Sequence, residues 1–465
     1  MPFGLMRYLG YAAGDVSNNL TFSMVSAFLL IYYTDVVGIS AATAGTLFLL
    51  VRIWGGVTDL LAGRRVDETS TRWGRFRPYL LFGSLPLLLT LVALFSVPSG
   101  LGPAGKLIWA YVSYALFSLA YSFVNIPYGS LAAAMTQEPE QRAKLSTARM
   151  VAASLTILAI AFVVSPQISG AGDLQRSLTV TTVVFAVLGF VFYLWCFATA
   201  RETVHRDVER VSLRETLGMM RRNRPLVLLC ASSLLFLTGM FSLQTVGVYY
   251  ARDVLGNADL YIVLTIVQTV GMIVAAVVVP KAVAAIGKKR AYVVAGVVTA
   301  AGGVGVALSP GSVPAVGIIA FGVLGFGMGI INTLIFALQA DTVDYGEWKS
   351  GVRAEGGSYA VLSFTRKAGQ GVGGALAAFT IGLGGYVAGS ATQSTAAETS
   401  IRIAAGALPA ATFLAATAIM LIYPLTEKAF RRIIAEMAER RVTAALERTE
   451  PAAAAVGTDE ATTAR

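Results

Sequence analysis

The chain contains twelve long, mainly apolar segments, and this feature limits its fold more than any other. An α-helix needs about 20 apolar residues to cross the hydrocarbon core of a bilayer, and each segment is close to this length or longer. Because a backbone in lipid must satisfy its own hydrogen bonds, we expect helices and no open strands. The predicted spans are residues 8–35, 41–63, 78–98, 105–133, 144–168, 178–200, 225–250, 259–286, 290–309, 313–340, 356–387 and 402–424.

The charged residues support an all-α membrane protein with a lipid bilayer as its surroundings. They make up only 13% of the chain, against about 25% in soluble domains. The formal net charge of +10 could indicate nucleic acid. However, the basic residues gather in short loops between apolar segments, which is the pattern of cytoplasmic loops. The sequence therefore predicts no nucleic-acid partner.

The spans divide into two sets of six. We predict an N-terminal half at residues 1–200, a connecting loop at 201–224, a C-terminal half at 225–424 and a tail at 425–465. The connecting loop carries seven arginines, so it and both termini are predicted to be cytoplasmic in a cell (inner) membrane protein. Two six-helix halves are typical of transporters whose site lies between the halves.

The tail is predicted to contain a cytoplasmic amphipathic helix followed by a disordered end. Phe430, Ile433, Ile434 and Met437 follow the spacing of one apolar helix face. We expect this face to lie on the inner membrane surface. The Ala/Thr-rich residues 449–465 are expected to be disordered.

Asp59 lies inside the second apolar segment and is followed directly by a basic loop. An ionised side chain inside a membrane span is costly, and it usually marks an ion or substrate pathway. Arg149 and Lys367 are cations inside later spans. These residues indicate a transporter.

Five stretches in both halves identify a family. They are Tyr32-Tyr-Thr-Asp-Val-Val-Gly38, Arg52-Ile-Trp54 followed by Asp59, Arg72-Trp-Gly-Arg-Phe-Arg-Pro78, Asn125-Ile-Pro-Tyr-Gly129, and Ala340-Asp-Thr-Val-Asp-Tyr-Gly-Glu347 followed by Arg353. The chain thereby resembles the glycoside–pentoside–hexuronide:cation symporters, a melibiose-permease-like branch of the major facilitator superfamily. The resemblance implies twelve transmembrane helices in the major facilitator fold, alternating access, and uptake of a sugar or glycoside with Na⁺, Li⁺ or H⁺.

The resemblance and the polar residues within spans predict the substrate site. In the family, an Asp at the place of Asp15 hydrogen-bonds the sugar. The family's residues at the places of Arg149 and Lys367 line the sugar cavity. Four polar residues within five positions of the first span are unusual in a membrane. The Tyr128 ring could stack on the sugar or simply pack against protein. The cations Arg149 and Lys367 could instead pair with Asp15, Asp59 or Asp341 and hold helices together. The predicted substrate-binding residues are Asp15, Asn18, Asn19, Asn125, Tyr128, Arg149 and Lys367.

The cation site departs from the family pattern. The family places two carboxylates one turn apart on the second helix, but Gly55 stands at the first of these positions. The remaining oxygen donors are Asp59, Thr58 and Ser122. One carboxylate and two hydroxyls form a thin cage for Na⁺, whereas a buried carboxyl readily carries a proton. H⁺ is therefore favoured over Na⁺, although waters or carbonyls could complete a sodium site, and an Asp paired for structure alone is a further alternative.

A cytoplasmic gate is predicted where the tenth span ends. Acidic and basic residues gather there and could form salt bridges between the two halves in the outward-facing state. Such exposed pairs are individually weak, about 0–1 kcal/mol each. The predicted gate residues are Arg142, Asp341, Asp344, Glu347 and Arg353.

We therefore predict a secondary active symporter for a sugar or glycoside, a substrate class that includes anionic sugars such as a uronate or sulfonated sugar. Alternatives are a Na⁺-coupled sugar symporter, a lysolipid transporter of the same family and a non-transporting membrane sensor. The sequence contains no nucleophile–base pair, metal-ligand cluster or phosphate loop, so no enzyme, metal or cofactor is expected. The protein is expected to act as a monomer.

Overall fold

The computed structural model describes residues 4–136, 138–170, 172–203, 223–350, 355–390 and 392–440. Within these ranges the regular structure is helical, apart from one isolated bridge between Thr71 and Gly74. Two of the predicted features, the loop at 204–222 and the tail after residue 440, lie outside the described residues.

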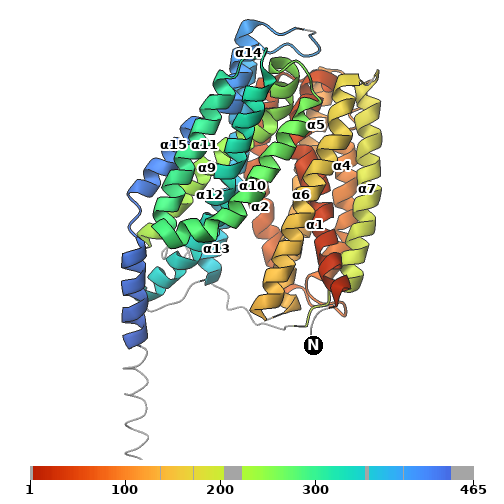
Figure 1. The fold of residues 1–465 in the computed structure, drawn as a ribbon. Coiled ribbons are helices and arrows are strands. Elements are labelled where there is room, and N and C mark those ends of the chain that lie inside the picture. The colour runs from red at the N-terminus through yellow and green to blue at the C-terminus, as the bar shows by residue number, and fades with distance from the viewer. Residues whose placement is uncertain are drawn as a thin grey trace, which may run out of the picture.

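The N-terminal helices follow the predicted order, and Figure 1 shows them side by side. The third span is broken at Gly83, because Pro86 in the next turn has no N–H to donate to the Phe82 carbonyl and its ring crowds that carbonyl. Ser40 caps the second helix, accepting a bond from the backbone N–H of Thr43 at 3.2 Å. The elements are α1 (Leu5–Ile31), η1 (Tyr32–Val37), α2 (Ala41–Glu68), α3 (Arg77–Phe82), α4 (Ser84–Leu94), α5 (Pro103–Met135), α6 (Pro139–Gly170) and α7 (Leu174–Thr199).

The C-terminal helices form the second half of the bundle. Asn223 caps the first of them, accepting from the backbone N–H of Leu226 at 3.1 Å. The elements are α9 (Arg224–Tyr249), η2 (Tyr250–Val254), α10 (Leu260–Ile286), α11 (Lys288–Leu308), α12 (Pro314–Ser350), α13 (Glu355–Leu383), α14 (Thr395–Arg402), η3 (Ile403–Ala407) and α15 (Leu408–Leu421).

Eleven helical segments in the described residues are both long and apolar enough to cross a membrane. The predicted eleventh span, α13, is 29 residues long but is absent from this set. It carries Arg366, Lys367 and Gln370 within five positions. These polar residues lower its hydropathy, and the architecture remains twelve spans because the length of α13 exceeds the membrane requirement.

Glycines allow close packing inside each half. In the C-terminal half, a side chain on Gly325 would meet the Gln268 carbonyl oxygen at 2.2 Å. In the N-terminal half, a side chain on Gly14 would meet the Tyr128 ring at 2.4 Å. Small residues at such crossings let helix backbones approach closely, which is how membrane helices gain packing energy.

The two halves touch through α2 with α13, α1 with α9, and α6 with α10. We call the end of the bundle where α1 begins the terminal end, and the opposite end the distal end. In Figure 1 the halves converge at the distal end and diverge toward the terminal end. At the distal end, the Thr34 and Tyr249 hydroxyls of opposite halves lie 2.8 Å apart.

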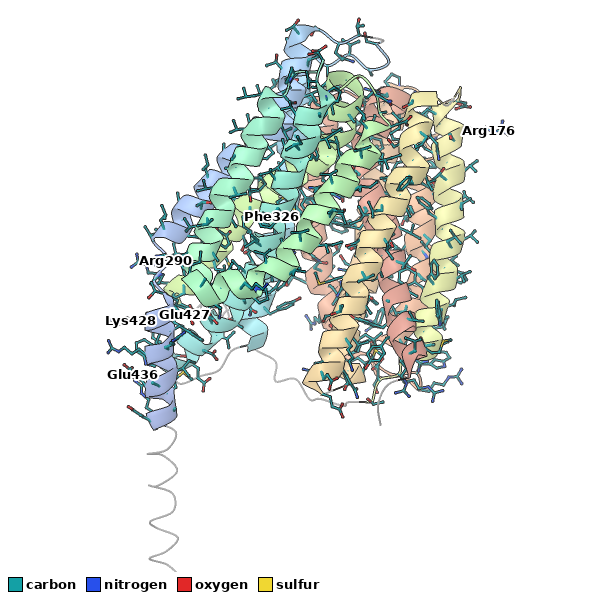
Figure 2. The ribbon with its side chains drawn as sticks, in the orientation of Figure 1. Arg176, Arg290, Phe326, Glu427, Lys428 and Glu436 are labelled. Carbon is teal, nitrogen blue, oxygen red and sulfur yellow. The ribbon has the colours of Figure 1, made fainter. Side chains whose placement is uncertain are left out.

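Residues 427–440 form the predicted tail helix, but it packs on protein. Ile433 and Met437 are buried, and the Trp348 indole donates to Glu436 at 2.8 Å. Figure 2 shows Glu427, Lys428 and Glu436 on this helix, beyond the end of the bundle. Protein thus covers two of the four apolar residues, whereas Ile434 is 40% exposed, and the contact of this remaining face with the membrane stays a prediction.

Candidate functional site

A cavity of about 990 Å³ lies between the two halves. Its walls come from α1, α2, α5 and α6 on one side and from α12 and α13 on the other. On α13 the lining runs from Val372 to Tyr359. Tyr359 is four residues into its helix, about 6 Å from its start. The cavity therefore reaches from mid-depth to the terminal end of the bundle.

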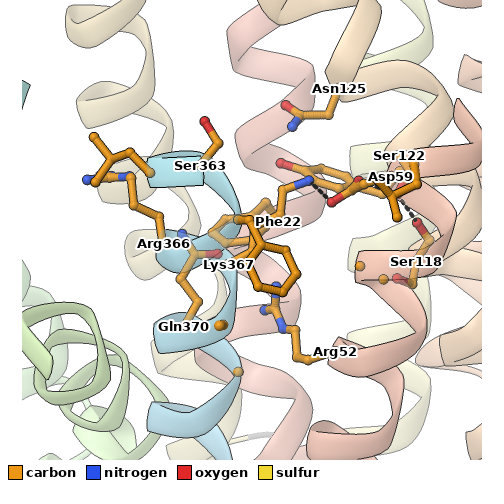
Figure 3. Close-up of a pocket in the computed structure, with 18 of the residues that line it drawn as sticks. Phe22, Arg52, Asp59, Ser118, Ser122, Asn125, Ser363, Arg366, Lys367 and Gln370 are labelled. Carbon is orange, nitrogen blue, oxygen red and sulfur yellow. Dashed lines mark hydrogen bonds and ion pairs between the residues drawn. The ribbon is translucent and has the colours of Figure 1, made fainter. Parts of the chain in front are cut away.

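One face of α13 supplies most of the polar lining on the C-terminal side. Ser363, Arg366, Lys367 and Gln370 recur three or four residues apart, so they share one helix face. Figure 3 shows Lys367 reaching toward α2, while Arg366 leaves the helix in a different direction. The same polar face lowers the hydropathy of this helix, which is absent from the set of eleven long apolar segments found in the described residues.

Asp59 is held by both halves of the protein. Its Oδ1 atom accepts a hydrogen bond from Ser122 at 2.7 Å, and its Oδ2 atom pairs with the Lys367 ammonium group. The Thr58 hydroxyl lies 2.9 Å from the Ser122 hydroxyl. The structure thus brings together the three residues predicted for cation coupling, and it adds Lys367 as their partner (Figure 3).

Arg149 pairs with Asp15 in the N-terminal half. The Arg149 Nε atom donates to Asp15 Oδ1 at 2.7 Å, and the Asn19 amide donates to Asp15 Oδ2 at 2.9 Å. Arg149 lines the cavity, whereas Asp15 is almost wholly buried behind it. A sugar in the cavity would therefore meet the guanidinium of this pair before the carboxylate.

The other predicted substrate residues divide into two groups. Asn125 lines the cavity. Asn18 is buried and its amide donates to the Gly14 carbonyl at 3.0 Å. Tyr128 is fully buried, stacks on Tyr11 at 5.0 Å and donates to the Tyr11 carbonyl. The alternative in which Tyr128 stacks on a sugar is wrong for this conformation, because its ring and hydroxyl are both taken up by protein.

Two arginines of the cavity were not among the predicted site residues. Arg366 reaches the Asn332 side-chain oxygen at 3.3 Å and lies 5.0 Å from the centre of the Phe336 ring. Arg52 lies over the Phe22 ring at 5.7 Å. Within the described residues, neither guanidinium forms an ion pair.

The charges of the cavity do not balance. Four cations line it, namely Arg52, Arg149, Arg366 and Lys367, against the single lining carboxylate Asp59. The carboxylate of Asp15 neutralises Arg149 from behind. Four positive and two negative charges leave two unmatched positive charges in this part of the molecule.

Comparison with known proteins decides the family. The model of a family described as MFS/sugar transport protein matches residues 10–427. The chain belongs to this MFS/sugar transport family. It is therefore a multi-pass membrane transporter with the major facilitator fold.

Relatives in the MFS/sugar transport family align along nearly the whole chain. A "Glucuronide carrier protein homolog" of Escherichia coli is 43% identical over 93% of this chain and 95% of its own length. An "Isoprimeverose transporter" of Lactiplantibacillus pentosus is 33% identical, over 92% and 90%. A "Putative sulfoquinovose importer" of Salmonella typhimurium is 30% identical, over 95% and 94%.

Solved structures show the same fold at low sequence identity. The nucleoside transporter NupG has a TM-score of 0.66 at 12% identity, covering 90% of this chain and all of that one. A peptide transporter POT mutant also has a TM-score of 0.66 at 12% identity, covering 90% and 93%. At this identity the likeness concerns the fold alone.

In the described chain, two of the predicted gate residues have contacts within their own half. Asp341 pairs with Lys288 of its own half at 2.7 Å. The Arg142 Nε atom donates to the Thr136 carbonyl at 2.9 Å, again within one half. Arg353 lies outside the described residues, and Asp344 and Glu347 lie on the last turns of α12.

A second ionic cluster, which the sequence reasoning missed, joins the halves at the distal end. The Arg252 guanidinium pairs with Asp35 of the other half at 2.6 Å, and with Asp253 at 2.8 Å. The Tyr386 hydroxyl donates to Asp35 at 2.8 Å. The side chains of Asp35, Asp253 and Arg252 are buried or half-buried. We call Asp35, Arg252, Asp253 and Tyr386 the distal cluster.

A repeat in the sequence could have revealed the distal cluster. Tyr32-Tyr-Thr-Asp-Val-Val-Gly38 in one half matches Tyr249-Tyr-Ala-Arg-Asp-Val-Leu-Gly256 in the other. Both copies wind into a short π-helix, and both end at a glycine with φ near +80°. Pseudo-symmetry places the two copies side by side, which brings an acid of one half to the arginine of the other.

Proposed function

We propose that this transporter takes up an anionic sugar, such as a glycoside of a uronic acid, in symport with a proton. The observation that carries the proposal is the pair of unmatched cations, Arg52 and Arg366, in the cavity between the halves. A neutral sugar would leave both guanidiniums without a counter-charge, which is unfavourable away from bulk water. An anionic sugar would supply one. The names of two relatives, "Glucuronide carrier protein homolog" and "Putative sulfoquinovose importer", support this substrate class.

The surroundings of Asp59 favour a proton as the coupling ion. Its Oδ2 atom is already taken by the Lys367 ammonium group, and its Oδ1 atom by the Ser122 hydroxyl. Na⁺ would have to displace the ammonium group and would then find one carboxylate and the hydroxyls of Thr58 and Ser122. A proton needs only one carboxylate oxygen, so it suits this site better.

The Asp59–Lys367 pair links proton binding to substrate binding. Protonation of Asp59 neutralises the carboxylate and leaves Lys367 as a third unmatched cation in the cavity. An anionic substrate then binds more tightly, and by thermodynamic reciprocity the bound anion raises the proton affinity of Asp59. Because the pair also joins α2 to α13, its loss removes a contact between the halves.

This scheme predicts electroneutral transport. One proton enters with one carboxylate or sulfonate group, so no net charge crosses the membrane in a cycle. A membrane potential, which is worth about 2.3 kcal/mol per charge per 100 mV, should have little effect on accumulation.

We propose that both termini lie in the cytoplasm and the chain in the inner membrane, and the arginines of the loops support this orientation. The terminal end is then cytoplasmic, and the cavity faces the cell interior. The distal cluster closes the outer side in this conformation. We propose that Arg142, Asp341, Asp344, Glu347 and Arg353 join the halves in the opposite, outward-facing conformation. We also propose that the protein acts as a monomer, which the position of the cavity between two halves of one chain supports.

Uptake by proteoliposomes tests the function. We expect para-nitrophenyl β-D-glucuronide to accumulate when the outside is acidic and the inside neutral. Accumulation should be the same with and without an imposed membrane potential, and a sodium gradient at equal pH should have no effect. Sodium-driven accumulation would contradict the proton assignment, and no uptake of the glucuronide under any gradient would contradict the proposed substrate.

A further inference from the structure

The Arg366 guanidinium is the cavity cation with the most unused hydrogen-bonding capacity on the side of α13. A guanidinium carries five N–H donors, and in the described residues Arg366 uses one of them, toward Asn332 at 3.3 Å. The Phe336 ring lies 5.0 Å from its central carbon. The ring and the amide both come from α12, so they fix one side of the guanidinium against that helix and leave its other donors for a ligand.

The other cations of the cavity are less suited to bind a substrate anion. Arg149 already pairs with Asp15 at 2.7 Å, and Lys367 with Asp59. Removing either cation from its partner would leave a carboxylate uncompensated in the bundle, which is costly. An anion at Arg366 breaks no existing ion pair.

Arg52 is the other unpaired cation, but its place differs. A side chain on Gly371 would meet the Arg52 stem at 2.5 Å, so α13 packs directly against that stem. Arg52 also borders a narrow space of about 20 Å³ beyond the main cavity, lined by Ser26 and Thr245. Arg52 therefore lies at the closed inner end, whereas Arg366 lies on the wall about two turns deeper than Tyr359.

The planar guanidinium group matches the shape of the anionic group that would neutralise the unmatched positive charge of the cavity. A carboxylate or sulfonate group presents two oxygens that a guanidinium binds with parallel N–H bonds, a geometry that lysine cannot reproduce. On the same helix face, Ser363 lies one turn before Arg366 and Gln370 one turn after it. Both side chains line the cavity and can form hydrogen bonds with the hydroxyls of an attached sugar ring.

We propose that Arg366 binds the anionic group of the substrate and sets the preference of the transporter for anionic over neutral sugars. The inference rests on the proposed function and names the residue that recognises the charge. The substrate class is a sugar or glycoside with a carboxylate or sulfonate group.

The test compares two ligands that differ only at carbon six of the sugar. Para-nitrophenyl β-D-glucuronide carries a carboxylate there, and para-nitrophenyl β-D-glucoside carries a hydroxymethyl group. Binding to the full-length purified protein is measured by calorimetry, and the readout is the ratio of the two Kd values. Loss of a charged hydrogen-bonding partner is expected to weaken glucuronide binding about 10- to 100-fold.

We expect Arg366→Gln to lower the glucuronide preference by this factor while glucoside binding stays within about threefold of wild type. Arg366→Lys should restore part of the preference, because it keeps the charge without the planar fork. Arg176→Gln, an exposed arginine at the edge of the bundle (Figure 2), is the matched control and should leave the ratio unchanged. Thermal unfolding of each variant shows whether it is folded.

An unchanged ratio in folded Arg366→Gln would overturn the inference while the proposed function stands. The same holds if Arg52→Gln, and not Arg366→Gln, removes the preference. Equal weakening of both ligands in Arg366→Gln and Arg366→Lys would show a structural role and would also overturn it. Wild-type protein that binds neither ligand would overturn the proposed function itself, together with this inference.

Discussion

Replacing Asp59 by Asn changes the proposed coupling site with little change in shape. The Asn side-chain oxygen can still accept the bond that Ser122 donates at 2.7 Å. The ion pair with Lys367 is lost, because the amide carries no charge. The variant therefore resembles the protonated form of the wild type permanently, with Lys367 unpaired in the cavity.

The energy of the lost ion pair follows from its exposure. The Asp59 and Lys367 side chains are 19% and 36% exposed. Breaking a fully buried pair costs about 3–5 kcal/mol, whereas an exposed pair is worth about 0–1 kcal/mol. This partly buried pair should fall between them, at about 1–3 kcal/mol, which corresponds to a change of about 5- to 150-fold in an equilibrium constant.

Two measurements use this magnitude. At neutral pH, Asp59→Asn should bind para-nitrophenyl β-D-glucuronide up to about 5- to 150-fold more tightly than the wild type, with no dependence on pH. In proteoliposomes, one pH unit is worth 1.36 kcal/mol, so one-to-one symport by the wild type should reach about tenfold accumulation. The variant should still exchange labelled for unlabelled glucuronide across the membrane, but it should not accumulate glucuronide.

A matched control removes one negative charge elsewhere. Glu140 lies outside the cavity, with its side chain 80% exposed, so Glu140→Gln should accumulate glucuronide like the wild type. Full accumulation by Asp59→Asn would refute the reasoning, because a fixed amide cannot carry a proton. Glucuronide binding by Asp59→Asn that follows pH as steeply as in the wild type would refute it as well.

Two further predictions concern the ends of the bundle. Arg252→Gln removes the ion pair that joins the halves at the distal end, so an impermeant thiol reagent added outside should label a cysteine placed at Ser26 about 5- to 150-fold faster. The two native cysteines are buried and should not interfere. An unchanged labelling rate would show that the distal cluster does not hold the outer side closed. Hydrogen bonds from Arg432 and Trp348 lower the pKa of Glu436 below its usual 4.5. The contribution of these two hydrogen bonds to the docking of the tail helix is present above pH 4.5 and is lost as the pH falls through the lowered pKa of Glu436. The fluorescence of a single-tryptophan variant that retains Trp348 should therefore change in acid. Glu436→Gln should abolish that change.

The spans were largely predictable because hydropathy is a local property of the sequence. A membrane helix satisfies its backbone internally, so its apolar length alone reveals it. The break at Gly83 was missed although its cause is local, because Pro86 within an apolar segment indicates an interrupted helix. The packing of the tail helix on protein was also missed, because the spacing of its apolar residues fits a membrane surface as well as it fits a protein surface.

The coupling residues were predicted through the family resemblance, and their convergence depends on packing. Thr58 and Asp59 are adjacent in α2, and Ser122 reaches them because α5 packs against α2. Tyr128 shows the opposite outcome. The sequence places it three positions after Asn125, a spacing that predicts one shared helix face, yet Tyr128 packs on Tyr11 of α1 while Asn125 lines the cavity.

The sequence by itself determined that the chain is a twelve-span transporter of a known family, with acidic and basic residues inside its spans. Apolar length, charge in the loops and short motifs carry that information locally. The tertiary structure decided which cation each carboxylate neutralises. Asp15 meets Arg149 across 134 positions, and Asp59 meets Lys367 across 308. Such pairings depend on which helices become neighbours when both halves close around the cavity, and only that arrangement left Arg52 and Arg366 without a counter-charge in the described chain.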